Sequence, residues 1–154
     1  MLIPEGVSWG AFRGAIPELS AQVRALFEQY GRAFGYLATV RRDGGPRVHP
    51  VSPVITDDGL YCFVLASPKR RDLERDGRYA LHAYPAEQSD DEAYLAGQAV
   101  PVADEEQRAG LAQAHGADDA SDWRLFELTI AVAVVTTRPH AMAPPQHHVW
   151  RATR

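Results

Sequence analysis

The single lysine of this chain, Lys69, lies within the heptapeptide Ser67–Leu73, where an apolar segment gives way to a basic one. Ser67 followed by Pro68 predicts the start of a helix, with the serine as N-cap and the proline in the first turn. A helix N-terminus presents backbone N–H groups without intrahelical partners and the positive end of the helix dipole, so it favours an anion. An ammonium group can swivel around a phosphate, which makes Lys69 a candidate phosphate ligand. The alternative is an ordinary capped helix whose basic first turn faces solvent.

Charge is unevenly distributed along the sequence. The net charge of −4 argues against nucleic-acid binding, which depends on several Lys or Arg contacts to phosphates. The second half of the chain is acidic, whereas the middle is basic. The basic residues of the middle are Arg41, Arg42, Arg47, Lys69, Arg70, Arg71 and Arg75. Such a local cluster suits a small anionic ligand better than a long polyanion.

Length and cysteine content limit the class of protein. The 154 residues are enough for a single domain with its own core over 1–154, which includes an N-terminal arm over 1–17 and a C-terminal tail over 138–154. Cys62 is the one cysteine, so no disulfide can form within the chain, and a reducing, cytoplasmic location is expected. The longest apolar run, 130–135, is too short to span a bilayer, so no membrane contact is expected.

Hydrophobic periodicity and turn residues predict the secondary structure. Helices are expected over 18–30, 68–76 and 104–115, and strands over 35–40, 48–55, 60–65, 79–84, 92–103 and 125–137. Gly- and Asp-rich connections join the first three strands, so these are expected to form an antiparallel meander. Pro50 and Pro53 cannot donate to a ladder, which makes the second strand either an edge strand or an interrupted one. Gly97 indicates a bulge or tight bend in the fifth strand. Six strands at this spacing predict an antiparallel barrel rather than a doubly wound parallel sheet.

Neither a metal site nor a motif of hydrolases, NTPases or dinucleotide-binding folds is found in the sequence. His140, His147 and His148 lack paired Cys or carboxylate neighbours, and Pro144-Pro145 predicts a loop, so a solvated tail without a metal is expected. Trp150 lies in this tail and could cross onto a partner subunit.

Four segments follow one another in a characteristic order: Arg47–Pro53, Leu60–Phe63, Ser67–Leu73 and Arg78–His82. Their order and spacing resemble the pyridoxamine 5'-phosphate oxidase-like family of FMN-binding split barrels, over about residues 20–137. The resemblance implies a mainly β fold with α, a six-stranded antiparallel split β-barrel with flanking helices. It also implies a homodimer with FMN in a groove at the interface, lined by both chains.

The resemblance further implies which residues bind the cofactor. The strand that carries Arg47 would support the flavin ring with its backbone and send a basic side chain to the phosphate, and the serine and lysine of the heptapeptide would hold the phosphate. In relatives the position matching Glu92 is often Gln, so a carboxylate there departs from the pattern. The candidate cofactor-binding residues are Arg47, Val48, His49, Pro50, Val51, Ser52, Cys62, Phe63, Ser67, Lys69, Arg70 and Glu92.

Pyridoxamine-phosphate oxidases themselves carry a C-terminal Arg-x-His substrate motif. The segment Val149–Arg154 lacks it, so oxidation of vitamin B6 is not expected. The leading interpretation is a homodimeric FMN-dependent oxidoreductase that acts on an unidentified small molecule. The alternatives are a non-catalytic flavin or haem binding protein, a redox sensor on the same fold, or a reductase that uses a deazaflavin coenzyme. Residues for general acid or base catalysis are not indicated.

Overall fold

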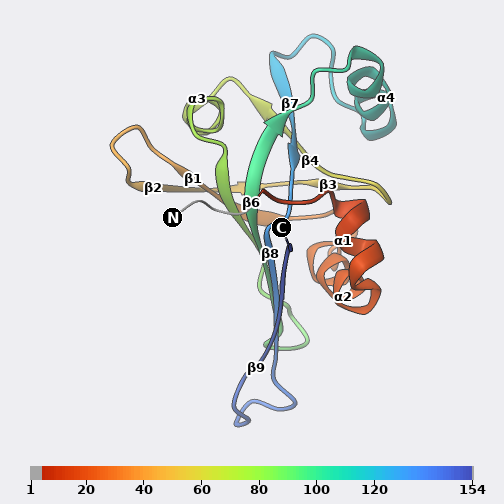
Figure 1. Ribbon diagram of the computed structural model, residues 1–154, viewed down its shortest axis with the longest axis vertical. Coiled ribbons are helices and arrows are strands. Elements are labelled where there is room, and N and C mark those ends of the chain that lie inside the picture. Colours follow the sequence, from red (N-terminus) through yellow and green to blue (C-terminus); the bar gives the residue numbers. More distant parts are fainter. Residues whose placement is uncertain (1–4, 154) are drawn as a thin grey trace.

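A curled antiparallel sheet with helices against its sides forms the protein, as seen in a computed structural model that describes residues 5–153 (Figure 1). The strands are β1 (Gly35–Val40), β2 (Pro46–Val51), β3 (Val54–Ile55), β4 (Leu60–Leu65), β5 (Arg78–Ala83), β6 (Glu92–Pro101), β7 (Trp123–Leu128), β8 (Val132–Thr137) and β9 (Gln146–Arg151). The helices are α1 (Trp9–Ala15), α2 (Pro17–Phe27), α3 (Pro68–Arg75) and α4 (Glu105–His115). The predicted mainly β fold with α is confirmed, as are the predicted helices that correspond to α2, α3 and α4.

The sheet divides at β6, its longest strand. The strand order is β2-β1-β5-β6-β7-β4-β3, and β8 pairs with both β6 and β9. One end of β6 pairs with β7 through Ala99–Pro101, and the other pairs with β8 through Glu92–Ala96. Gly97 lies between these two stretches, where a Cβ atom would collide with the carbonyl oxygen of Thr129. Glycine is therefore required by a close backbone approach, in line with the predicted irregularity.

The predicted strand number is wrong. Nine strands, not six, are present in the part of the chain that the structure describes. The expected strand over 48–55 breaks into β2 and β3 because Pro53 has no N–H to continue the ladder. The expected strand over 125–137 breaks into β7 and β8 because the chain changes from one end of β6 to the other at Thr129.

The antiparallel pairings of the predicted meander are confirmed, but its three strands do not form one continuous run of neighbours in the sheet. β1 and β2 form one hairpin, and β3 and β4 form another. The second neighbour of β1 is β5, whereas that of β4 is β7, so the two hairpins lie at opposite ends of the strand order. Both alternatives for the proline-containing strand hold, because β2 is an edge strand and the chain is interrupted before β3.

Both ends of the described chain fold onto the core. Helix α1 lies within the expected N-terminal arm, and its Trp9 and Phe12 are fully buried. The expected tail is solvated, because most side chains of β9 are exposed, but the expectation of a loop is wrong for β9, which pairs along its whole length with β8. Trp150 in β9 packs on Phe12 of the same chain, with ring centroids 4.9 Å apart. No helix in the described residues has the length and apolar character needed to cross a membrane.

Candidate functional site

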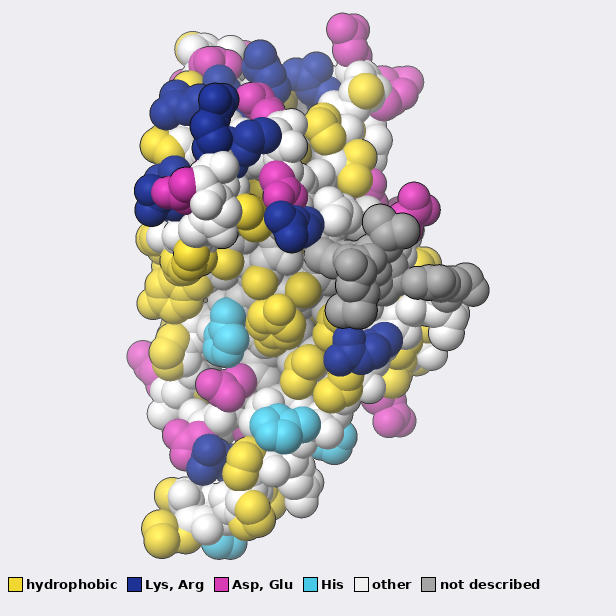
Figure 2. Space-filling view, turned by 60° about the vertical axis from the view of Figure 1, so that its left-hand side comes forward, with side chains coloured by type: hydrophobic (Ala, Val, Ile, Leu, Met, Phe, Trp, Pro, Cys, Tyr) yellow, Lys and Arg dark blue, Asp and Glu magenta, His cyan; other side chains and the backbone are white. Residues whose placement is uncertain are grey.

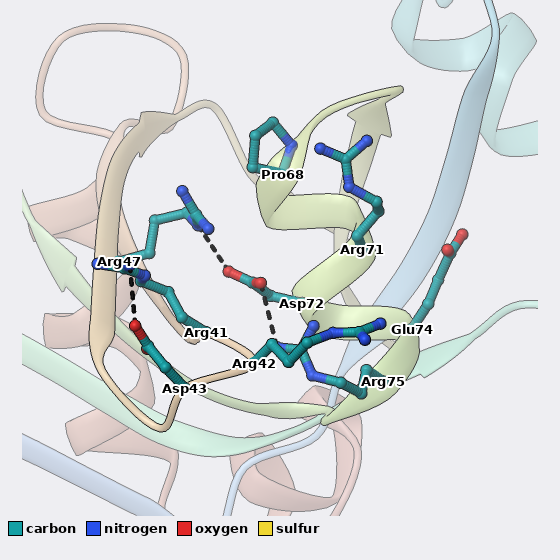
Figure 3. Close-up of a pocket in the computed structure, with 9 residues that line it drawn as sticks. All are labelled: Arg41, Arg42, Asp43, Arg47, Pro68, Arg71, Asp72, Glu74 and Arg75. Atoms are coloured by element: carbon teal, nitrogen blue, oxygen red, sulfur yellow. Dashed lines mark hydrogen bonds and ion pairs between the residues drawn. The ribbon is translucent and has the colours of Figure 1, made fainter.

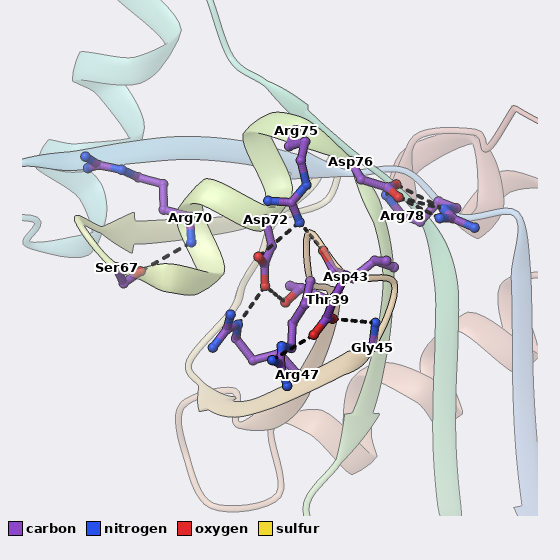
Figure 4. A network of polar contacts seen from close by, with 12 residues as sticks. Thr39, Asp43, Gly45, Arg47, Ser67, Arg70, Asp72, Arg75, Asp76 and Arg78 are labelled. Atoms are coloured by element: carbon purple, nitrogen blue, oxygen red, sulfur yellow. Dashed lines mark hydrogen bonds and ion pairs between the residues drawn. The ribbon is translucent and has the colours of Figure 1, made fainter.

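The N-terminus of α3 is capped by its own serine (Figure 4). The Ser67 hydroxyl oxygen accepts from the backbone N–H of Arg70 at 3.3 Å, and the hydroxyl donates to the Leu65 carbonyl oxygen at 2.8 Å. The expected N-cap and first-turn proline are confirmed. Lys69 is half-buried, and the described residues provide no hydrogen-bond or ion-pair partner for its amino group.

A buried carboxylate, Asp72, joins α3 to the β1–β2 hairpin (Figure 4). It accepts from Arg47 Nε at 2.7 Å, from the Thr39 hydroxyl at 2.8 Å and from Arg75 Nη2 at 3.1 Å. Burial alone would raise the pKa of Asp72, but these hydrogen bonds outweigh it and hold the pKa below the usual range of an Asp side chain. The guanidinium groups of Arg47 and Arg75 are thereby fixed in place.

Both of these arginines face a cleft of about 710 Å³ between α3 and the β1–β2 hairpin, here called the basic cleft (Figure 3). It is lined by Arg41, Arg42, Asp43, Arg47, Pro68, Arg71, Asp72, Glu74 and Arg75. Arg41 pairs with Asp43 at 3.0 Å, whereas Arg42 and Arg71 form no ion pair within the described chain. Five arginines against three carboxylates leave a surplus of positive charge, which suits an anion.

A second cleft, of about 590 Å³, surrounds the break between β2 and β3 and is here called the bend cleft. It brings together two candidate residues, Ser52 and Phe63, with the C-terminus of α4. The Ser52 hydroxyl donates to the Ala33 carbonyl oxygen at 2.7 Å and accepts from Arg32 Nε at 3.1 Å. Arg47 lies near the start of β2 and Ser52 directly follows its last residue, so the two are about 17 Å apart at the usual rise per residue of a strand.

Three other candidate residues have neighbours of their own. The Cys62 side chain lies in the core, where burial raises the pKa of its thiol to about 12, so only its backbone could contact a ligand. Arg70 donates to the Asp122 carbonyl oxygen at 2.9 Å and pairs with the Asp122 carboxylate at 3.2 Å. Glu92 lies beside His82, with 3.8 Å between Oε1 and Nε2, and lines a separate cleft.

The outer face of the sheet is largely apolar over six strands. Directly paired residues form one row of Pro50, Tyr36, His82, Tyr94, Val134 and Val149, and a second row of Val48, Ala38, Ala80, Ala96, Val132 and Arg151. Tyr36 is 41% exposed, Val48 60% and Val149 52%. Hydrophobic side chains and histidines are visible across the middle of the molecule in Figure 2, below a group of Lys and Arg side chains. Apolar surface of this extent is typical of an interaction site.

The family profile described as pyridoxamine 5'-phosphate oxidase matches residues 19–137. The chain belongs to this family. A comparison with curated protein sequences gave no match.

Two of the solved structures with a similar fold are named as haem proteins. A heme binding protein from Mycobacterium smegmatis has a TM-score of 0.63 and 19% identity over 85% of this chain and 57% of its own, so this chain spans little more than half of it. HutZ, the heme storage protein from Vibrio cholerae, has a TM-score of 0.57 and 18% identity over 73% of this chain and 89% of its own. General Stress Protein 26 from Bacillus anthracis has a TM-score of 0.60 and 16% identity over 86% of this chain and 97% of its own. At these identities the likeness concerns the fold.

The two clefts fit the chemistry of a pyridoxamine 5'-phosphate oxidase-family cofactor. Planar guanidinium groups, such as that of Arg47, match the geometry of a phosphate. The apolar side chains of the bend cleft, including Phe63, suit a flat ring at the other end of β2. Within the described residues, His, Cys, Asp and Glu do not form a group of three or more that could hold a metal ion.

Asp72, which fixes Arg47, was not predicted from the sequence. The available signal was a carboxylate directly beside the apolar Leu73 within the basic helix, because a charge that faces inward needs basic partners. Arg32 was not predicted either, because its contact with Ser52 joins the connection between α2 and β1 to the bend before β3.

Proposed function

We propose that this member of the pyridoxamine 5'-phosphate oxidase family is a flavin-dependent oxidoreductase that binds FMN at a homodimer interface and acts on a small molecule. The observation that carries the proposal is the fixed Arg47 guanidinium at the edge of a cleft with surplus positive charge. A pre-positioned guanidinium binds phosphate at a lower entropic cost than a mobile one.

The proposed site extends along β2. The phosphate lies at the basic cleft and the start of α3, where Arg47, Ser67, Lys69 and Arg70 contribute side chains or backbone N–H groups. The ring lies toward the bend cleft, against the backbone of Val48 to Ser52 and of Cys62, with the Phe63 side chain beside it. When bound, FMN supplies the hydride or electron transfer, while the chain binds it, orients it and excludes water.

The outer face supports the homodimer. Tyr36 and Tyr94 lie in the same row and remain 41% and 37% exposed, so a second copy of the chain would bury them. Glu92 is separate from the basic cleft of its own protomer, and in the dimer it is proposed to approach the cofactor that is held mainly by the partner.

A second candidate function is non-catalytic storage or sensing of haem or flavin on the same fold. It is supported by the two haem proteins among the similar structures. A deazaflavin-dependent reductase is a third candidate, because a phosphorylated tail would also suit the basic cleft.

The visible absorption spectrum of freshly purified protein separates these functions, since flavin, deazaflavin and haem have different bands. FMN should also raise the stability by about 2.7 kcal/mol at a hundredfold excess over its Kd. Lys69→Ala should weaken binding of FMN but not of riboflavin, and Arg13→Ala, which changes an exposed arginine of α1 outside the site, should weaken neither. Equal affinity of the unaltered protein for FMN and riboflavin would contradict the phosphate site.

A further inference from the structure

Arg32 is held at the rim of the bend cleft by two contacts. Its Nε donates to the Ser52 hydroxyl oxygen at 3.1 Å, and its guanidinium carbon lies 5.8 Å from the centroid of the Phe34 ring. Ser52 is itself fixed by its bond to the Ala33 carbonyl oxygen. Both terminal nitrogens of Arg32 are left without a protein partner among residues 5–153. The group therefore keeps four N–H donors on its two terminal nitrogens for a ligand.

The other charged groups of the bend cleft do not neutralise Arg32. Glu28 is the one carboxylate of the lining, and both of its oxygens accept from Arg24 Nε, at 3.1 and 3.2 Å. His115, at the end of α4, adds a group that is neutral or positive. The cleft thus has an uncompensated cation at its rim.

The rest of the lining is largely apolar. Pro53 is buried, and Val54 and Ile55 continue the wall beyond it. Phe63 is held edge-on by Trp123, with ring centroids 5.0 Å apart and an interplanar angle of 82°. A cleft with one apolar wall and one fixed guanidinium suits a compact ligand that has a hydrophobic body and a carboxylate.

We propose that the bend cleft binds a small carboxylate-bearing substrate and that Arg32 determines this specificity by pairing with the carboxylate through its two terminal nitrogens. This inference rests on the proposed function, because the cleft shares Ser52 and Phe63 with the proposed position of the flavin ring. Ser52 is a positioning residue: it orients Arg32 and does not contact the substrate.

Benzoate, with benzamide as its neutral analogue, tests the inference. Binding to the purified protein loaded with FMN is measured by calorimetry and by the change in the visible absorption of FMN. Benzoate should bind and benzamide should not. Arg32→Gln should weaken benzoate binding roughly ten- to hundredfold, the range expected for hydrogen bonds to a charged group. Arg32→Lys, which keeps the charge but not the fork, should bind with intermediate affinity.

Arg13→Gln is the matched control, since Arg13 is an exposed arginine of α1 that lines neither cleft. It should leave benzoate binding unchanged, whereas Arg32→Gln should leave FMN affinity and the melting temperature unchanged. Equal binding of benzoate and benzamide, no benzoate binding at all, or benzoate binding that survives Arg32→Gln would each overturn the inference.

The same measurements distinguish a failure of the proposed oxidoreductase function from a failure of the proposed carboxylate site. Protein that binds no flavin but binds benzoate in an Arg32-dependent way supports the carboxylate site and contradicts the oxidoreductase. Protein that binds FMN but not benzoate contradicts only the carboxylate site.

Discussion

Arg47 Nε and Asp72 Oδ2 lie 2.7 Å apart and join the edge strand β2 to helix α3. The pair is asymmetric, because the Asp72 side chain is 3% exposed whereas that of Arg47 is 28% exposed. The carboxylate cannot be solvated and needs its three donors, but the guanidinium retains a surface that faces the basic cleft. Asp72 therefore serves both stability and the shape of the proposed phosphate site.

Asp72→Asn should destabilise the protein by about 2 kcal/mol, because Thr39, Arg47 and Arg75 lose a charged hydrogen-bond acceptor while the two arginines remain partly solvated. Urea unfolding followed by circular dichroism measures the change in the free energy of unfolding. FMN affinity should fall as well, since Arg47 loses its anchor.

Asp76→Asn is the matched control for this prediction. Asp76 also pairs with an arginine, Arg78, at 2.6 Å, but it lies outside the basic cleft and its partner is exposed. An exposed pair adds little to stability. If the two variants lost equal stability, the buried network would have no special role.

The stability that Asp72 confers should depend on pH. Its pKa in the folded protein lies below the value of about 3.9 expected for an unfolded chain. The stabilisation is therefore fully present above about pH 4, and it is lost as the pH falls through the pKa of the folded state. The difference in unfolding free energy between the unaltered protein and Asp72→Asn should shrink between neutral pH and about pH 3. A difference that stayed constant over this range would show that Asp72 does not titrate differently on folding.

The elements that could be predicted from the sequence are those bounded by turn residues or helix caps, because these signals act between residues close together in the chain. The expected strands over 35–40 and 60–65 agree with β1 and β4, because turn residues bound both. Helix α3 follows the Ser-Pro signal, and Asp104 caps α4 through a bond from Gln107 at 2.7 Å. Each of these features depends on residues within four positions of one another.

The missed features depend on distant parts of the chain. Strand β9 has no buried face apart from the partly buried Trp150, so it lacks the alternation that predicts a strand, and it forms because β8 offers an edge. The order of the strands is set by pairing between residues far apart, such as those of β1 and β5. The split of the candidate residues between two clefts likewise follows from the length of β2, since Arg47 lies near its start and Ser52 directly after its end.

Cys62 should be unreactive in the folded protein. Its thiol is 2% exposed, and burial raises its pKa to about 12, so almost no thiolate forms near neutral pH. A colourimetric thiol reagent should label the protein in urea but not under native conditions. Cys62→Ala should leave FMN affinity unchanged, since only the backbone of this residue is proposed to contact the cofactor. Rapid native labelling, or a large loss of FMN affinity in this variant, would place the thiol in the site instead of the core.

The outer face should hold the dimer together. Tyr94→Arg introduces a charge into the middle of the apolar row, opposite His82 on one side and Val134 on the other. A charge that is buried without a partner opposes association, so light scattering after gel filtration should show a monomer. Leu65→Arg is the matched control, because Leu65 is a similarly accessible apolar residue, 56% exposed, on β4 outside the two rows. That variant should remain a dimer.

Because the proposed FMN site is shared between protomers, Tyr94→Arg should also lose most of its FMN affinity while its far-ultraviolet circular dichroism is preserved. A monomer that still bound FMN as tightly as the unaltered protein would separate cofactor binding from self-association, and the proposed site would then have to be complete within one chain.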